Sequence, residues 1–292
     1  MRHSLENDIL TITVDDHGAE LKSITAKRDG TEYLWNGDPA WWKYSSPVLF
    51  PIVGKLVKGK YRYNGHEYEL PGHGFGRISD FTCVRQSNDE IAFLLESNDE
   101  TLKSYPFPFR LEISYVLRQN EVKVHWKVTN PDTSDMYFSI GAHPALRCPI
   151  DKGDDFKDCF LKFNISENSQ RIMLNADGPL SHKRVDILNG TELSLDYELF
   201  KEDALVFDDL KSDEVSICSR KSGKSVTLKA KDFPFWGIWT KPGAPFLCIE
   251  PWHGHADYED FAGDLSEKDG IRKLRGGESF DAEYSFLVNN GT

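Results

Sequence analysis

The sequence predicts an all-β protein, mainly antiparallel, that forms one large β-sandwich with few short helices. Apolar and polar residues alternate with a period of two along much of the chain, which is typical of half-buried strands. The 22 glycines and 14 prolines are dispersed, as expected for many short strands joined by turns. The 292 residues contain no linker-like tract, low-complexity block or internal repeat. We therefore predict a single domain over residues 1–292.

Two hairpins are the clearest local signals. Asn64-Gly65 lies between alternating aromatic residues within 61–68, a pattern typical of a tight hairpin. The alternating runs 111–117 and 122–128 flank a short turn and predict a second hairpin. Further strands are predicted at 9–14, 91–96, 159–165, 214–219, 224–230, 236–240, 246–250 and 281–288. Helical periodicity is limited to 195–202 and 257–265.

The composition excludes several classes of partner. Hydrophobic residues make up 39% and aromatic residues 12%, enough for a large core. The net charge of −12 repels phosphate backbones and anionic lipids, so neither a nucleic acid nor a membrane partner is expected. No apolar run approaches the ~20 residues of a membrane span, and the first residues lack an apolar signal-peptide core. We therefore expect a cytoplasmic protein.

The cysteines fit that compartment. The chain has five, an odd number, widely spaced and without a CxxC pair. This pattern fits neither a disulfide framework nor a zinc ribbon, and we interpret the cysteines as small buried hydrophobes.

Glu250 is the first candidate for chemistry. It ends the apolar run 246–249 and is followed by Pro251 and Trp252. A carboxyl group at the end of a buried strand and against an indole is desolvated, which raises its pKa toward the range of a general base. The alternative is a structural ion pair with a Lys or Arg at the strand end.

Two histidines are further candidates. His143 lies in Gly141-Ala142-His143-Pro144, where the proline favours an extended backbone and the small residues leave space around the ring. Such an imidazole suits a general acid, although a satisfied core histidine is the alternative. His73 lies between Gly72 and Gly74, so that a ligand can approach its ring.

The other histidines are weaker candidates for a functional site. His125 alternates with Val124 and Trp126 beside two lysines, which indicates a solvated strand face. His253 and His255 with Asp257 offer a metal site, but no further well-spaced ligands support it and a loop is the preferred interpretation. We expect no metal. The Gly72–Gly76 segment has the wrong glycine spacing for a dinucleotide loop.

Six of the seven tryptophans suggest a substrate class. Flat aromatic faces pack against the C–H faces of sugar rings, and a few polar groups then fix the orientation. Ordinary core packing is the alternative for each one, but carbohydrate is compatible with all the candidate residues together. The six are Trp35, Trp41, Trp42, Trp236, Trp239 and Trp252.

Six segments in order resemble the aldose 1-epimerase (galactose mutarotase-like) family, and within it the lactose-operon X-protein branch. They begin at Gly18-Ala19-Glu20-Leu21 and Tyr33-Leu34-Trp35-Asn36-Gly37. They continue through Pro47-Val48-Leu49-Phe50-Pro51-Ile52-Val53-Gly54, His73-Gly74-Phe75, Gly141-Ala142-His143-Pro144 and Ile249-Glu250-Pro251-Trp252. The resemblance covers nearly the whole chain. It implies a β-supersandwich, in agreement with the strand pattern.

The resemblance also implies an activity, the interconversion of the α and β anomers of free aldoses such as galactose or glucose without cofactor or metal. It places the general base at Glu250, the general acid at His143 and a substrate-facing histidine at His73. Asp203 is the implied ligand for sugar hydroxyls, and we add Arg77 and Trp239 as substrate-binding candidates. Lys55 is a departure, because many relatives have a sugar-contacting arginine there; it is a substrate-binding candidate whose point charge orients a polyol differently.

Three other functions stay open from the sequence. A hexose-6-phosphate 1-epimerase needs a phosphate clamp, which Lys55, Lys58, Lys60 and Arg77 offer. A non-catalytic carbohydrate-binding protein fits the aromatic residues equally well. A glycoside hydrolase needs two flanking carboxylates, and Glu250 is the only one in a persuasive context. The expected partner is a small sugar, and the expected state is a monomer or homodimer.

Overall fold

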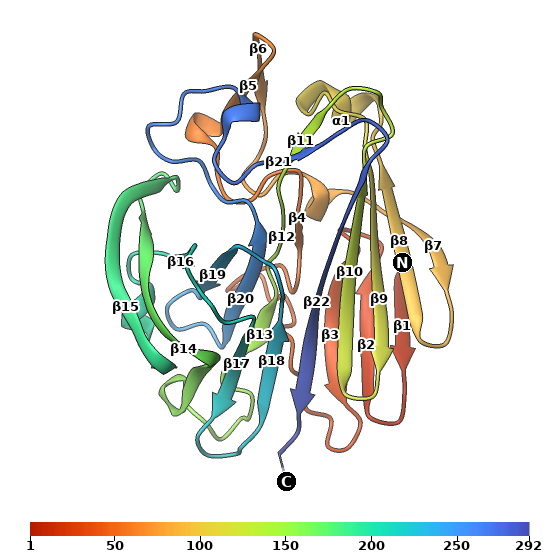
Figure 1. Cartoon of the computed structure of the whole chain (residues 1–292). Coiled ribbons are helices and arrows are strands. Elements are labelled where there is room, and N and C mark those ends of the chain that lie inside the picture. The colour runs from red at the N-terminus through yellow and green to blue at the C-terminus, as the bar shows by residue number, and fades with distance from the viewer. Residues whose placement is uncertain (292) are drawn as a thin grey trace.

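The computed structural model describes residues 1–291, and antiparallel sheets dominate it (Figure 1). The N-terminal strands form a small sheet of β1 (Arg2–Glu6), β2 (Leu10–Asp15) and β3 (Glu20–Ala26). Two short pairs lie outside the main sheets, namely β5 (Lys60–Tyr63) with β6 (His66–Glu69) and β11 (Met136–Phe138) with β21 (Arg272–Leu274).

Most other strands belong to one large curved sheet. β13 (Ala145–Arg147) also pairs with β20, and β15 (Leu180–Ser194) pairs with β14. The main path runs through β4 (Val48–Leu49), β12 (Ile140–Ala142), β20 (Phe246–His253), β19 (Phe235–Trp239), β16 (Leu205–Phe207), β14 (Cys159–Leu174), β17 (Glu214–Ser219), β18 (Ser225–Lys229), β22 (Ser279–Asn289), β10 (Glu121–Thr129), β9 (Arg110–Arg118), β8 (Glu90–Glu96) and β7 (Thr82–Gln86).

The small sheet packs on the half of the large sheet that contains β8, β9, β10 and β22 (Figure 1). Alternate residues of both sheets face inward and share one core cluster, in which Ile12 and Phe93 are fully buried. The hydroxyl of Tyr115, on β9, donates to the carbonyl of Ala19 across the interface at 2.7 Å. The predicted antiparallel sandwich is therefore confirmed, whereas the one-domain organisation stays a prediction.

The predicted strands are all present, and both hairpins have the expected turns. Asn64 and Gly65 have φ of 49° and 79°, as a tight hairpin turn requires, and β9 and β10 pair from Arg118 opposite Glu121. β14 is longer than predicted, since it continues to Leu174 to pair with β15, which the sequence pattern did not reveal.

The helix predictions were less accurate. The region 195–202 contains a short 3-10 turn, η4 (Tyr197–Phe200). The helix at 257–265 is wrong, because Asp257 and Tyr258 instead run beside Leu180, whose N–H donates to the Asp257 carbonyl at 2.8 Å. The remaining helical elements are short: α1 (Asp99–Ser104), η1 (Val57–Gly59), η2 (Gly76–Ile78), η3 (Phe156–Asp158) and η5 (Leu265–Glu267).

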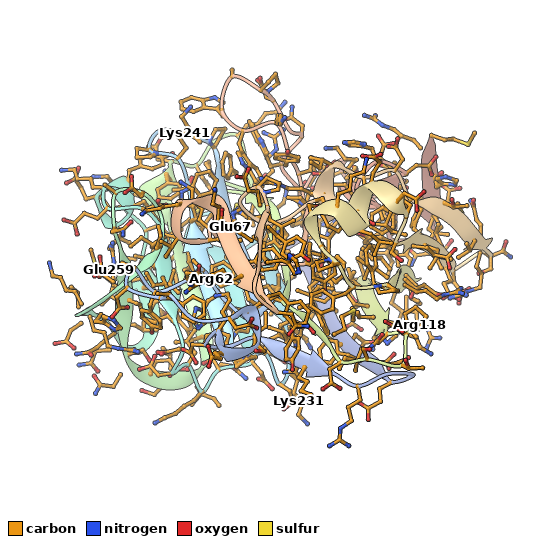
Figure 2. The ribbon with its side chains drawn as sticks, turned by 90° about the horizontal axis from the view of Figure 1, so that it is seen from above. Arg62, Glu67, Arg118, Lys231, Lys241 and Glu259 are labelled. Atoms are coloured by element: carbon orange, nitrogen blue, oxygen red, sulfur yellow. The ribbon has the colours of Figure 1, made fainter. Side chains whose placement is uncertain are left out.

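Charged side chains extend from the surface of the molecule, and most of the cysteines are buried. Seen from above, Arg118 and Glu259 extend from opposite sides of the molecule (Figure 2). Cys148, Cys159 and Cys248 are buried, Cys83 and Cys218 are partly buried, and all five cysteines are free thiols. No helix within residues 1–291 is long and apolar enough to span a bilayer.

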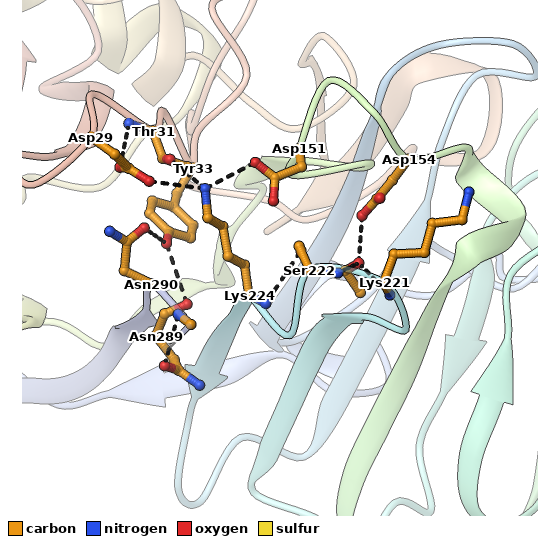
Figure 3. A network of polar contacts seen from close by, with 12 residues as sticks. Asp29, Thr31, Tyr33, Asp151, Asp154, Lys221, Ser222, Lys224, Asn289 and Asn290 are labelled. Atoms are coloured by element: carbon orange, nitrogen blue, oxygen red, sulfur yellow. Dashed lines mark hydrogen bonds and ion pairs between the residues drawn. The ribbon is translucent and has the colours of Figure 1, made fainter.

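A polar network joins segments that are far apart in sequence (Figure 3). The ammonium of Lys224 lies 3.0 Å from Asp29, 2.9 Å from Asp151 and 2.8 Å from the Thr31 hydroxyl. Beside it the Tyr33 hydroxyl donates to the side-chain carbonyl of Asn290 at 2.8 Å. Since the Lys224 side chain is only 14% exposed, these bonds are less screened than a surface ion pair.

The packing of Trp252 determines the shape of the sheet near β20. A Cβ added at Gly237 would lie 2.3 Å from its indole, and one at Gly141 would lie 2.5 Å from it. These two glycines, on the strands that flank β20, leave room for the ring to lie flat on the sheet. The indole N–H donates to the Ala142 carbonyl at 3.2 Å.

We expect Gly237→Ala to destabilise the protein by about 1–3 kcal/mol, the usual cost of overpacking a core. Urea unfolding monitored by fluorescence measures this loss. Gly153→Ala is the matched control, because a Cβ there meets no atom within 4 Å and should cost little. Equal stabilities of the two variants would contradict the proposed role of the glycine.

Candidate active site

One pocket of about 230 Å³ gathers all seven site residues that the sequence predicts. It lies among β12, β19 and β20, the loops that carry His73 and Asp203, and the tip of the β14–β15 hairpin. The predicted residues in its wall are Lys55, His73, Arg77, His143, Asp203, Trp239 and Glu250, and they are joined by Trp42, Gly54, Leu174, Gly178, Leu180, Ala204, Val206, Trp252, His255 and Ala256.

Glu250 lies within β20, with Ile249 and Pro251 on either side and Gly237 opposite on β19. Its side chain is 2% exposed. Burial raises the pKa of Glu250 well above its ordinary value, and the negative charge of Asp203 acts in the same direction. Its Oε2 atom accepts no hydrogen bond within the described residues. Among residues 1–291, Glu250 pairs with His143 and forms no ion pair with a Lys or Arg, the alternative that the sequence left open.

His143 directly follows β12, where its N–H donates to the Pro47 carbonyl at 3.1 Å. Its ring stacks on Trp42 with centroids 4.7 Å apart, and its Nε2 atom lies 3.3 Å from Oε2 of Glu250. Burial lowers the pKa of His143 well below its ordinary value, and His73 and Arg77 add to the effect. The structure thus places an imidazole and a carboxyl group in direct contact.

His73 is held at a sharp turn. Its φ of 66° is in the left-handed region, and its backbone N–H donates to the Gly54 carbonyl at 2.8 Å. The Gly54 N–H in turn donates to Nδ1 of His73 at 3.2 Å. Burial, Arg77 and Lys55 lower the pKa of His73 to about 3. The neutral ring therefore carries its proton on Nε2 and can donate a hydrogen bond.

Asp203 lies at the mouth of the pocket, on an exposed turn after η4. Its φ of 70° is rare for a residue with a side chain, and its carboxylate accepts from the Ala204 N–H at 2.8 Å. The guanidinium of buried Arg171 holds this turn, because it donates to the carbonyls of Leu199 and Glu202 at 3.0 and 2.9 Å. The carboxylate is thus fixed at the pocket entrance.

Two cations of the predicted phosphate clamp line the pocket. The ammonium of Lys55 donates to the Asp177 carbonyl at 3.0 Å, which ties it to the hairpin tip, and Arg77 donates to the Gly72 carbonyl at 2.9 Å. The other two do not line it. Lys58 lies in η1, and Lys60 pairs with Glu67 and Glu69 outside the pocket.

The structure does not bring His253, His255 and Asp257, the alternative metal ligands, together into one set. Asp257 pairs instead with buried Lys268 at 3.1 Å, and Nε2 of His255 lies 3.2 Å from Asp269. Within residues 1–291, the one close set of three possible ligands is His143, Cys248 and Glu250. Burial raises the pKa of the Cys248 thiol, which stays protonated and is a poor metal ligand.

Several wall residues could not be predicted from the sequence. Trp42 is one of the tryptophans that suggest a sugar site, but no sequence signal indicates that His143 stacks on its ring. Leu174, Gly178 and Leu180 reach the pocket because β14 continues to Leu174 and is followed by β15, a strand that the pattern did not predict. No local signal connects these residues with Glu250, since only the tertiary fold brings them together. His125 lies on a solvent-facing side of β10, as predicted, and its Nε2 atom is 3.1 Å from the carboxylate of Asp281.

The chain and its fold have known relatives. A family model for aldose 1-epimerases matches residues 1–269, and the chain belongs to this family. It is 34% identical over 300 residues to protein LacX, plasmid, of Lactococcus lactis subsp. lactis, which covers 99% of this chain and 100% of that protein. The resemblance to the LacX-like branch is thus confirmed.

Two solved structures have the same fold as this chain. A galactose mutarotase related enzyme from Lactobacillus acidophilus superposes with a TM-score of 0.95 at 35% identity, over 100% of this chain and 98% of that chain. A galactose mutarotase-like protein from Lactobacillus casei gives 0.94 at 29% identity, over 99% and 100%. The predicted supersandwich fold is therefore confirmed.

Glu250→Gln should stabilise the protein increasingly as pH rises. Because the folded pKa of Glu250 is raised, the wild type loses stability above the ordinary Glu pKa of about 4.3, by at most about 1.4 kcal/mol per pH unit. The neutral amide removes this loss. Urea unfolding from about pH 5 to 8 should show a growing difference in the free energy of unfolding.

Glu283→Gln is the control, because Glu283 is 49% exposed and pairs with Lys123 on the strand face. A difference between Glu250→Gln and the wild type that stays constant with pH would contradict a buried, proton-retaining carboxyl.

Proposed function

We propose that the protein is an aldose 1-epimerase that interconverts the α and β anomers of a free aldose such as galactose or glucose. The contact of 3.3 Å between His143 and Glu250 is the observation that carries this proposal. In an aldose, the ring oxygen and the anomeric hydroxyl are bonded to the same carbon. An acid and a base that serve these two oxygens must therefore be neighbours, and family membership supports the same chemistry.

The reaction needs only proton transfers. Glu250 takes the proton of the anomeric hydroxyl, the C1–O5 bond breaks, and His143 donates a proton to the ring oxygen. The open aldehyde rotates about C1–C2. His143 then takes the proton back from O5 as the oxygen attacks the other face of C1, and Glu250 returns its proton to the new hydroxyl. No covalent intermediate with the protein forms.

The buried pair holds one exchangeable proton in this scheme. Burial favours the neutral carboxyl and the neutral imidazole, whereas the reactive pair is a carboxylate and an imidazolium. Both pairs contain the same number of protons. Sugar binding therefore needs a shift of one proton between two atoms 3.3 Å apart, without uptake from solvent. The sugar hydroxyls supply the dipoles that favour the charged pair.

The other wall residues would bind and orient the sugar. The neutral His73 ring offers a donor, and the Asp203 carboxylate offers an acceptor at the entrance. Trp239 and Trp42 present aromatic faces to a ring, and Arg77 and Lys55 present further donors. In this assignment Lys55 exchanges its bond to the Asp177 carbonyl for one to a hydroxyl.

A free aldose is a better substrate candidate than a hexose 6-phosphate. Lys55 and Arg77 are placed to meet a phosphate, but Asp203 and Glu250 line the same 230 Å³. A hydrolase is disfavoured because Glu250 faces His143 rather than a second carboxylate across a glycosidic bond. The five free thiols support the predicted cytoplasmic location.

The wild type should accelerate the decay of optical rotation of fresh α-D-galactose and α-D-glucose. Glu250→Gln and His143→Asn should each lower kcat about 10²- to 10⁴-fold, the usual contribution of one positioned acid or base. His125→Asn is the matched control, since His125 lies on an exposed strand face and should keep full activity. Circular dichroism verifies that each variant is folded.

A folded wild type that binds sugar without accelerating rotation would indicate a binding protein and would overturn the proposal. In a competition assay, glucose 6-phosphate should inhibit galactose mutarotation no better than glucose does. Stronger inhibition by the phosphate would instead favour the hexose-6-phosphate epimerase.

A further inference from the structure

Within the described residues, three aromatic rings pack around the imidazole of His143, and of these Trp42 alone lies against its face. The centroids of the two rings are 4.7 Å apart, and the ring planes differ by 29°. His73 and Trp239 instead meet the imidazole edge to face, with centroids 5.5 and 5.7 Å away. The indole of Trp42 is thus the surface along which the imidazole lies.

Hydrogen bonds do little to fix the plane of that imidazole. In a functional histidine, the second ring nitrogen often bonds to a carboxylate or a carbonyl, which sets the tautomer and the orientation. Nδ1 of His143 is buried and has no hydrogen-bond partner within residues 1–291. Nε2 meets Glu250, the other group of the proposed proton transfer. Stacking on Trp42 therefore takes the place of the hydrogen bond that orients the ring in other sites.

The indole of Trp42 is itself held in place. Its backbone N–H donates to the carbonyl of Asp38 at 2.9 Å, and its carbonyl accepts from the indole N–H of buried Trp35 at 2.8 Å. The ring also stacks on the buried ring of Phe246, with centroids 5.8 Å apart. Trp42 therefore has a defined position against which the imidazole can align.

The indole face also favours the charged form of the imidazole. In the proposed reaction, His143 must be an imidazolium when it protonates the ring oxygen, whereas burial, His73 and Arg77 lower the pKa of that ring. The face of an indole attracts a cation within about 6 Å of its centre, most strongly where water is excluded. Trp42 thus acts in the same direction as the negative charge of Glu250, toward the reactive pair.

We infer that Trp42 is a positioning residue for the proposed general acid, and that its indole holds the imidazole of His143 in the plane from which the ring turns its nitrogen to the sugar. The same contact stabilises the imidazolium. This inference rests on the proposed function, and it adds a residue that acts through His143. The contact that Trp42 makes with the sugar is secondary to this role, so its loss should affect the chemical step more than binding.

Trp42→Leu removes the aromatic face and should lower kcat about 30-fold, which corresponds to about 2 kcal/mol, the size of a desolvated cation–π interaction. KM for galactose or glucose should rise by no more than about threefold. Trp42→Phe keeps an aromatic face and should recover most of kcat. Polarimetry over a range of sugar concentrations measures both constants. A large rise in KM with kcat unchanged would overturn the inference, because Trp42 would then act as a sugar platform.

Trp41→Leu is the matched control, because it makes the same change one residue earlier in the same loop. Trp41 is 36% exposed and does not line the pocket, so both kcat and KM should stay at the wild-type values. Circular dichroism verifies that each variant is folded. Equal losses of kcat in the Trp41 and Trp42 variants would overturn the inference, since the loop as a whole would then be responsible.

A double-mutant cycle separates a role through His143 from a direct one. In the His143→Asn background, Trp42→Leu should change the residual kcat by less than about threefold, because the group that the indole positions is gone. A second loss of about 30-fold in this background would overturn the inference. The indole would then act on the sugar or on the fold without His143.

Nuclear magnetic resonance observes the ring of His143 directly. In protein labelled with ¹³C at histidine, the signal that is missing in His143→Asn belongs to His143. The ring current of the stacked indole should shift its Cε1–H proton upfield, and Trp42→Leu should move it downfield, whereas Trp41→Leu should not. An unmoved signal in Trp42→Leu would overturn the inference. A wild type that accelerates no sugar would overturn the proposed function, and this signal would still decide whether Trp42 orients the ring.

Discussion

The flat packing of Trp252 on the sheet is the constraint on which the site depends. The indole covers Gly237, the residue opposite Glu250, and is bonded to the carbonyl of Ala142, the residue before His143. The indole thus contacts β12, which precedes His143, and β19, which pairs with Glu250, the two residues that we propose as acid and base. Glu250 itself is buried, which keeps the pKa of that carboxyl high. A side chain on either flanking glycine would lift the ring and alter the distance between the two groups.

The site carries an electrostatic cost that the rest of the fold offsets. Oε2 of Glu250 and Nδ1 of His143 are buried without a hydrogen-bond partner in the described residues, and each such group costs about 1–3 kcal/mol. Two buried polar atoms without hydrogen-bond partners in one pocket are expected where a ligand supplies the missing hydrogen bonds. The large common core of both sheets provides the stability that permits it. In the proposed function, the hydroxyl groups of a bound sugar would supply hydrogen bonds to these atoms.

The sequence allowed prediction of those features that short-range patterns determine. Alternation identified β9 and β10, and Asn64-Gly65 identified the turn between β5 and β6. Motif resemblance selected residues that the structure brings into one pocket, although their roles stay predictions. The pattern failed at 257–265, because the polar and apolar spacing there resembles a helix while the backbone bonds to Leu180, about 80 residues earlier. The stacking of Trp42 on His143 was equally invisible, since it depends on the position of a loop.

The place of β22 has a consequence for synthesis of the chain. This strand lies between β18 and β10, and it joins the two halves of the large sheet. On the ribosome, the edges of β10 and β18 stay open until residues up to Asn289 have emerged from the exit tunnel. Open strand edges recruit other strands, so the nascent chain is exposed to aggregation throughout that interval. The large sheet is therefore completed only after residues 1–289 have been synthesised, and a shortage of chaperones would reduce the yield of this protein more than that of one built from sequential hairpins.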